Sequence, residues 1–104
     1  MPSTDEYVSY ALDLLSEVPE VTTRKMMGET MLYASGRLFG GVYDDRLLLK
    51  ATPSSEAMLP DALRETPYEG SKTEMLLVDF EDRSRLAQII ASMLPELSAS
   101  KKKR

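Results

Sequence analysis

The side chains that could do chemistry in this chain are mainly carboxylates and cations, because it contains no His, no Cys and no Trp. Without Cys there is no thiolate nucleophile, no disulfide and no Cys-based metal site. Without His the usual near-neutral acid–base group and the commonest transition-metal ligand are both missing, and a Ser-His-Asp triad is excluded. We therefore expect no catalytic residue, no cofactor-binding residue and no metal ligand, and we predict that the chain is not an enzyme.

Two pairs of adjacent carboxylates are the remaining candidates for acid–base catalysis, Asp44-Asp45 and Glu81-Asp82. A hydrolase that works with two carboxylates needs them on opposite sides of a cleft. Asp44-Asp45 falls where a turn is expected, and Asp82 precedes a helical pattern in the position of an N-cap. Both pairs thus have structural roles that explain them without catalysis.

Basic and aromatic residues alternate in the middle of the chain. The basic ones are Arg24, Lys25, Arg37, Arg46 and Lys50. On one face of a sheet, such a set could stack bases and neutralise phosphates. The competing interpretation, which we favour because the chain is acidic, is that strand alternation only turns the basic side chains toward solvent. These five residues are the candidate contact for a partner or a nucleic acid.

Charge is unevenly distributed along the 104 residues, which include 13 Lys and Arg and 17 Asp and Glu, a formal charge of -4. Four basic residues form the run 101–104, so residues 1–100 hold nine basic and 17 acidic side chains and a charge of -8. An acidic body is poorly suited to duplex binding, where phosphate neutralisation supplies most of the affinity. We expect one domain over residues 1–97 and a flexible basic tail over 98–104.

The elements that must position these side chains are read from the spacing of apolar residues. Helical spacing of apolar residues covers residues 4–17, and Ser3 and Glu6 have capping-box spacing at the start of this helix. A second stretch of helical spacing begins after the Asp82 cap and ends at about Leu94. Thr52-Pro53 begins a short helix over residues 54–59, and residues 61–63 are expected to add a turn. The extended stretches are residues 21–27, 31–34, 37–43, 46–50, 68–70 and 75–80.

Turns between the extended stretches are very short, which implies antiparallel neighbours. We therefore predict an α+β fold, a two-layer sandwich with helices on one face of an antiparallel sheet. Gly40-Gly41 lies inside a strand, where a bulge or bend is a better explanation than a ligand loop. The second sheet face is left to solvent or to a partner, and a homodimer through that face or an edge strand is one candidate.

The first residues are acidic and polar, unlike a signal peptide, and no apolar run approaches the roughly 18 residues of a membrane span. We expect a cytoplasmic location and no membrane partner. A small-ligand site would need a deep pocket with convergent polar groups.

A recognisable pattern runs through the extended stretches. Its parts are Arg24-Lys25-Met26-Met27-Gly28, Met31-Leu32-Tyr33, Gly36, Asp44 and Leu47-Leu48-Leu49-Lys50, followed by Pro67-Tyr68-Glu69 and the apolar stretch 75–80. Over about residues 5–97 the chain resembles the TfoX/Sxy N-terminal domain family, whose pattern is roughly Arg-x-Met-Phe-Gly-Gly-x-Gly-Leu-Tyr and then Leu-Tyr-Leu-Lys. It departs from that pattern at Met27, at the reduced glycine turn Gly28-Glu29-Thr30 and at Leu48.

The resemblance implies an α-β(3)-α-β(2)-α order, similar to secretion chaperones, and brings no catalytic residues. Because family members are linked to bacterial competence and transcription, it implies a small cytoplasmic regulatory or interaction domain that acts through a protein partner, here as a standalone N-terminal domain. The alternative function is that of a nucleic-acid-binding accessory protein, which would use the basic middle segment and the tail.

Overall fold

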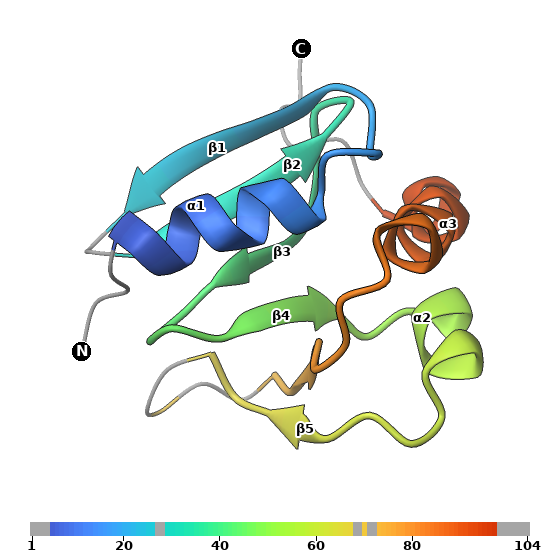
Figure 1. The fold of residues 1–104 in the computed structure, drawn as a ribbon. Coiled ribbons are helices and arrows are strands. Elements are labelled where there is room, and N and C mark those ends of the chain that lie inside the picture. The colour runs from blue at the N-terminus through green and yellow to red at the C-terminus, as the bar shows by residue number, and fades with distance from the viewer. Residues whose placement is uncertain (1–4, 27–28, 68–69, 71–72, 98–104) are drawn as a thin grey trace, which may run out of the picture.

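The computed structural model describes residues 5–26, 29–67, 70 and 73–97 of the chain. Within them, six strands form one antiparallel sheet in the order β1-β2-β3-β4-β6-β5. The elements are α1 (Asp5–Leu14), β1 (Val21–Met26), β2 (Glu29–Ala34), β3 (Arg37–Val42), β4 (Leu47–Lys50), α2 (Pro53–Met58), β5 (Arg64–Glu65), β6 (Met75–Leu77), α3 (Arg83–Met93) and a closing 3-10 turn, η1 (Leu94–Glu96). Figure 1 shows α1 lying across β1 to β3, with α2 and α3 beside it.

Two tight turns set the antiparallel order. Ser35 and Gly36 between β2 and β3 have φ values of 53° and 79°, and Asp44 and Asp45 between β3 and β4 have 52° and 56°. Positive φ at both central residues belongs to the two-residue turn whose twist matches that of a hairpin. The predicted turns and the predicted antiparallel pairing are confirmed.

The helix caps also follow the sequence. The Thr52 hydroxyl accepts a hydrogen bond from the amide of Ser55 at 3.1 Å, and the Ser55 hydroxyl accepts from the amide of Thr52 at 2.8 Å. The Asp82 carboxylate accepts from the amide of Arg85 at 3.0 Å. These bonds satisfy amides that the first turn of a helix leaves unpaired, so both predicted N-caps are confirmed.

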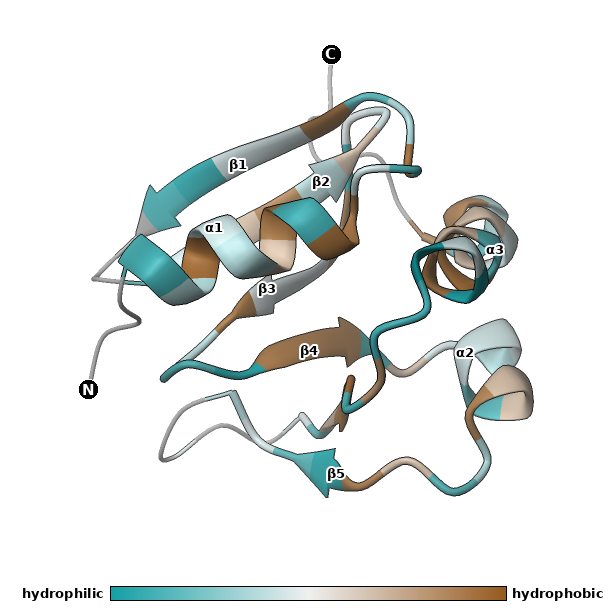
Figure 2. Cartoon of the chain, viewed as in Figure 1, coloured by the Kyte–Doolittle hydropathy of each residue, from teal (hydrophilic) through white to brown (hydrophobic). Residues whose placement is uncertain are grey.

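The order of elements differs from the one that the resemblance implies, because four strands instead of three precede α2. The register runs from Val21 opposite Ala34 to Met26 opposite Glu29, so residues 21–26 and 29–34 form two full paired strands. The α+β class and the helices on one sheet face are as predicted. Figure 2 shows the hydrophobic β4 inside the sheet and the hydrophilic β5 at its border.

Some element boundaries were predicted wrongly. The first helix ends at Leu14 and not at residue 17, because the chain tightens there: the amide of Ser16 donates to the carbonyl of Asp13 at 3.1 Å. After α2 the amide of Ala62 donates to the carbonyl of Leu59 at 3.2 Å, so the turn expected near residues 61–63 is present at residues 60–61; it adds no helix, and the short strand β5 follows. β6 ends at Leu77 and not at residue 80. The Ser3 cap, residues 68–69 and the tail 98–104 lie outside the described residues.

Apolar side chains fill both sheet faces unequally. The main core lies between the sheet and the helices and is formed by Ala11, Leu14, Leu32, Phe39, Val42, Leu47, Leu49, Leu76, Leu86, Ile89, Ile90 and Met93, among others. The opposite face carries a smaller cluster of Tyr43, Leu48 and Met75, with Met31 and Leu77 against it. The second face is thus partly covered by the chain's own side chains. In the described part of the chain, no helix is long and apolar enough to cross a membrane.

Candidate functional site

Neighbouring basic residues of β1 point to opposite sheet faces. Arg24 is opposite Met31, which belongs to the smaller cluster, and Lys25 is opposite the buried Thr30 of the helix-covered face. The Lys25 ammonium lies 3.7 Å from the Asp5 carboxylate of α1, and both side chains are well exposed. Arg24 is exposed and borders a hollow of about 310 Å³ near the β2–β3 turn.

Arg37 supports the end of α3. Its Nη1 donates to the carbonyl of Leu94 at 2.6 Å and to that of Leu97 at 3.2 Å. The last carbonyls of a helix have no partner within the helix, and a cation there is favourable. The half-buried Arg37 therefore has a structural role.

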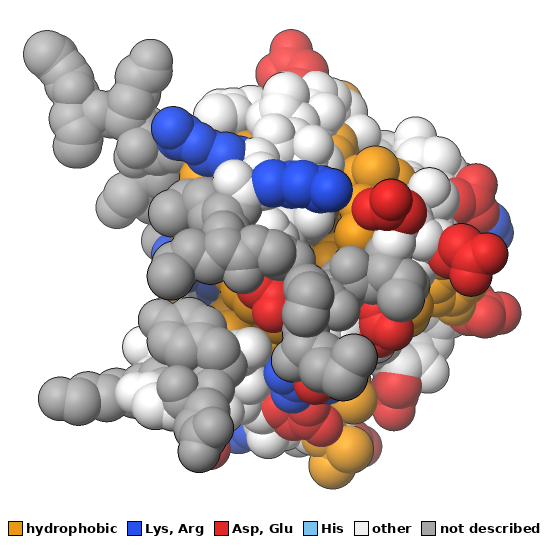
Figure 3. Space-filling view, turned by 90° about the vertical axis from the view of Figure 1, so that its left-hand side faces the viewer, with side chains coloured by type: hydrophobic (Ala, Val, Ile, Leu, Met, Phe, Trp, Pro, Cys, Tyr) orange, Lys and Arg blue, Asp and Glu red, His pale blue; other side chains and the backbone are white. Residues whose placement is uncertain are grey.

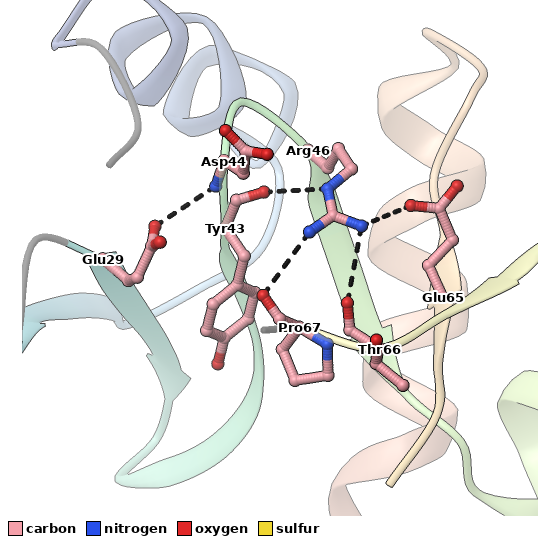
Figure 4. Close-up of polar contacts among 7 residues, drawn as sticks. All are labelled: Glu29, Tyr43, Asp44, Arg46, Glu65, Thr66 and Pro67. Carbon is pink, nitrogen blue, oxygen red and sulfur yellow. Dashed lines mark hydrogen bonds and ion pairs between the residues drawn. The ribbon is translucent and has the colours of Figure 1, made fainter. Parts of the chain in front are cut away.

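Arg46 holds the β3–β4 turn to the chain that follows β5 (Figure 4). Its Nε donates to the carbonyl of Tyr43 at 3.1 Å, and its Nη1 contacts the Glu65 carboxylate. Nη1 also donates to the carbonyl of Thr66 at 3.4 Å, and Nη2 donates to the carbonyl of Pro67 at 3.4 Å. A planar guanidinium can bond several acceptors at once in this way. Its donors are therefore occupied within the fold.

Lys50 is half-buried on β4, opposite Met75, and shares a sheet face with Arg24. Because β2 and β3 lie between them, the two strands are about 14 Å apart. The five basic residues are thus not brought together: Lys25 and Arg37 are on the helix-covered face, Arg46 is bonded within the fold, and Arg24 and Lys50 are separated. Figure 3 shows acidic side chains over much of the right-hand half and two basic side chains close together toward the upper left.

Two hollows of the described surface border Phe80 instead. One hollow of about 510 Å³ is bordered by Tyr7, Tyr10, Leu14, Asp79, Phe80 and Glu81. A second, of about 300 Å³, is bordered by Leu59, Asp61, Ala62, Asp79, Phe80 and Arg85. The two hollows meet at Asp79 and Phe80, and we call them together the Phe80 groove. In Figure 1 the connection from β6 to α3, which contains these two residues, passes between α1 and α2.

Local structure explains why Phe80 lies between the hollows. The amide of Val78 still donates to the carbonyl of Leu47 at 2.9 Å, but the strand has ended at Leu77. The Asp82 cap then begins α3, which leaves residues 79–81 as a short irregular connection. The Arg85 guanidinium lies 4.8 Å from the centre of the Phe80 ring, a cation–π contact. Phe80 is therefore held at the surface by α3.

Tyrosines of α1 form the opposite wall. The rings of Tyr7 and Tyr10 are 5.6 Å apart, and the Tyr10 hydroxyl donates to the Glu81 carboxylate at 2.7 Å. This hydrogen bond raises the pKa of Tyr10 above its ordinary value, whereas burial is the main cause that raises the pKa of Tyr7. The hydrogen bond joins α1 to the connection that carries Phe80.

Removing the Glu81 charge should lower the pKa of Tyr10. In the variant Glu81→Gln we expect the Tyr10 pKa to fall toward 10.0, because the acceptor that favours the neutral phenol loses its charge. Because the pKa of Tyr10 is raised in the folded state, the hydrogen bond to Glu81 stabilises the fold below about pH 10. This stabilisation is lost as the pH rises through the folded-state pKa of Tyr10. NMR titration of the tyrosine rings measures the shift. Glu20→Gln, remote from Tyr10 in the contacts described, is the control, and an unmoved Tyr10 in Glu81→Gln would rule out the contact.

One of the exposed large apolar side chains, Tyr10, borders the same groove. Among the described residues, the large hydrophobic side chains that are exposed are Tyr10 at 40% and Leu63 at 60%. Tyr10 lines the groove, and Leu63 directly follows Ala62, which also lines it. The groove thus combines an aromatic and aliphatic surface with a carboxylate rim.

Sequence reasoning missed this site. Phe80 was placed at the end of a strand and Glu81 beside a helix cap, although both line the groove. The available signal was the alternation Asp79-Phe80-Glu81 next to a cap, which puts an aromatic ring between two charges. No group of three or more acidic residues in the described ranges is placed to hold a metal ion.

Comparison with protein families gives a match over most of the chain. The model of the TfoX N-terminal domain matches residues 13–92 of this chain. Searches of curated proteins and of solved structures give no match.

Proposed function

The chain belongs to the TfoX N-terminal domain family, and on that premise we propose that it is a regulatory interaction domain that binds a protein partner through the Phe80 groove. We further propose that it is not an enzyme and that it acts in the cytoplasm, in keeping with the family's link to competence and transcription. In this proposal the domain acts by binding its partner and not by catalysis.

One observation carries the proposal: the exposed Tyr10 and the half-buried Tyr7 and Phe80 border the same groove, whose border also includes the exposed carboxylates of Asp79 and Glu81. Clustered exposed apolar area, rimmed by polar groups, is typical of interaction sites, whereas single exposed apolar residues are not. Aromatic side chains also supply much of the energy at protein interfaces. Tyr10 and Phe80 are the expected anchors.

Nucleic-acid binding through the five basic residues has less support. Arg37 and Arg46 already bond carbonyl groups within the fold. Affinity for a phosphate backbone increases with the number of cations that reach it. Of the five, only Arg24 and Lys50 have no ion pair and no side-chain hydrogen bond in the described structure. Few cations therefore remain for contact with a phosphate backbone.

A photo-crosslinking amino acid placed at position 10 tests the proposal in cells that express the chain. We expect a covalent adduct with a specific protein, identified by mass spectrometry, and loss of that adduct when Phe80→Ala is added. The matched control places the same amino acid at Thr22, an exposed β1 residue outside the groove. Adducts at position 22 that persist in Phe80→Ala, with none at position 10, would contradict the proposal.

A further inference from the structure

We infer that the Phe80 groove receives a cationic segment of its partner, with a Lys or Arg side chain seated in the hollow between Asp61 and Asp79. This inference rests on the proposed function and names the chemistry of the partner. It follows from three properties of that hollow: its apolar lining, its two carboxylates and the pairing state of the charges around it.

The lining suits the stem of a long basic side chain. Leu59, Ala62 and Phe80 border the hollow of about 300 Å³, and Asp61 and Asp79 are exposed at its rim. Lys and Arg bury their methylene groups against apolar surface while the charged head stays at a polar edge. An aliphatic ligand would leave the carboxylates without a counterion, and an acidic ligand would be repelled by them.

The two carboxylates are free to accept such a head group. In the described ranges neither Asp61 nor Asp79 forms an ion pair or a hydrogen bond. Other acids nearby are engaged: Glu81 accepts from Tyr10, and Glu56 pairs with Arg64 at 3.0 Å. The groove's own cation, Arg85, stacks on Phe80 and donates to the carbonyl of Met58 at 3.3 Å. A partner cation therefore meets two uncompensated charges.

The wider charge of the chain favours the same partner. Residues 1–100 carry a formal charge of -8, and a field of that sign attracts cations and repels acidic segments over distances of about 8–10 Å in physiological salt. The tyrosines of the first hollow add aromatic faces on which a second cation or an apolar side chain can pack. A short segment in which basic and apolar residues alternate fits both hollows.

Capped hexapeptides test the inference on the full chain. The probe alternates leucine with arginine, and two matched peptides carry citrulline or glutamate in place of arginine. By NMR titration we expect the arginine peptide to bind at least about 10-fold more tightly than the citrulline peptide, a ratio that corresponds to about 1.4 kcal/mol. Amide shifts should change at residues 79–85, and the glutamate peptide should not bind.

Variants separate charge recognition from the groove itself. Asp61→Asn with Asp79→Asn should abolish the preference for arginine over citrulline, whereas Glu20→Gln with Glu74→Gln, which removes two charges outside the groove, should preserve it. Phe80→Ala should weaken both peptides equally. Equal binding of the arginine and citrulline peptides, or shifts confined to residues 21–26, would overturn the inference.

The crosslinking experiment separates failure of this inference from failure of the proposed function. If position 10 still crosslinks to a protein through a neutral or acidic segment, the inference fails while the proposed function stands. If position 10 gives no adduct, the proposed function fails.

Discussion

Replacing Gly40 with alanine should destabilise the domain by about 3 kcal/mol, the largest effect that we expect of a single methyl group. A Cβ at this position would lie 2.2 Å from the carbonyl oxygen of Leu48 and 3.1 Å from the Cα of Leu49. Both contacts are with backbone, which cannot rotate away as a side chain would. The strands β3 and β4 would have to separate, and the fully buried Phe39 and Leu49 would lose their packing. Urea unfolding followed by circular dichroism measures the change.

Gly36→Ala is the matched control for this prediction. Its added Cβ would meet nothing within 4 Å, so the cost comes only from the φ of 79°, about 1 kcal/mol. Gly40 is also next to an irregularity: Leu32 is opposite Gly40, but Tyr33 is opposite Leu38, so Phe39 is an extra residue in β3. The bulge expected at Gly40-Gly41 lies one residue earlier, at Phe39, while both glycines pair regularly with β2 and β4. Equal costs for Gly36→Ala and Gly40→Ala would show that the close approach of β4 is not what requires glycine.

Replacing Arg46 with alanine should lower the free energy of unfolding by about 2 kcal/mol. The guanidinium has four acceptors, and its side chain is only 27% exposed, so its removal leaves the Glu65 carboxylate and three carbonyls without this donor. Arg46→Lys should recover less than half of the loss, because one ammonium group cannot reach acceptors spread over a planar fork. Chemical unfolding of the three proteins measures the difference.

Arg24→Ala is the control for Arg46. It removes the same charge from an exposed side chain with no bonded partner among the residues described, so we expect a change below about 0.5 kcal/mol. An equally large loss for Arg24→Ala would mean that the two cations have the same role. A negligible change in the free energy of unfolding for Arg46→Ala would mean that Arg46 has no structural role and is available to bind an external ligand.

Local signals in the sequence were sufficient for most of the fold. Ser35-Gly36 and Asp44-Asp45 predicted the turns because glycine lacks a Cβ and aspartate adopts positive φ more readily than most residues. Thr52 and Asp82 predicted helix starts because the side-chain oxygen of each accepts from an amide three residues away. Apolar spacing was less reliable at the end of α1, because Leu15 lies beyond the helix and is still buried. Burial, not helical structure, maintains that spacing.

Contacts between distant segments could not be predicted in this way. The two-residue strand β5 exists through its pairing with β6, opposite Leu76 and Met75. Arg46 and Glu65 are 19 positions apart, and Arg37 and Leu94 are 57 apart. The sequence could not show that the five basic residues are separated onto different faces and into internal contacts, because that separation depends on register and tertiary pairing.

The candidate groove required the same tertiary information. Tyr10 belongs to α1 and Phe80 to the connection before α3, and only folding brings them to the sides of one hollow. The absence of His and Cys predicts that the chain is not an enzyme, and this stays a prediction. It did not indicate which apolar side chains remain at the surface, because that depends on how completely the helices cover the sheet.

Hydrogen–deuterium exchange of the full chain, with and without the purified protein that the position-10 crosslink identifies, tests the central claim most directly. We predict slower exchange at residues 7–14 and 78–85 on binding, and unchanged exchange at residues 21–26 of β1. Protection confined to residues 21–26, with unchanged exchange on both sides of Phe80, would contradict the groove as the interaction surface.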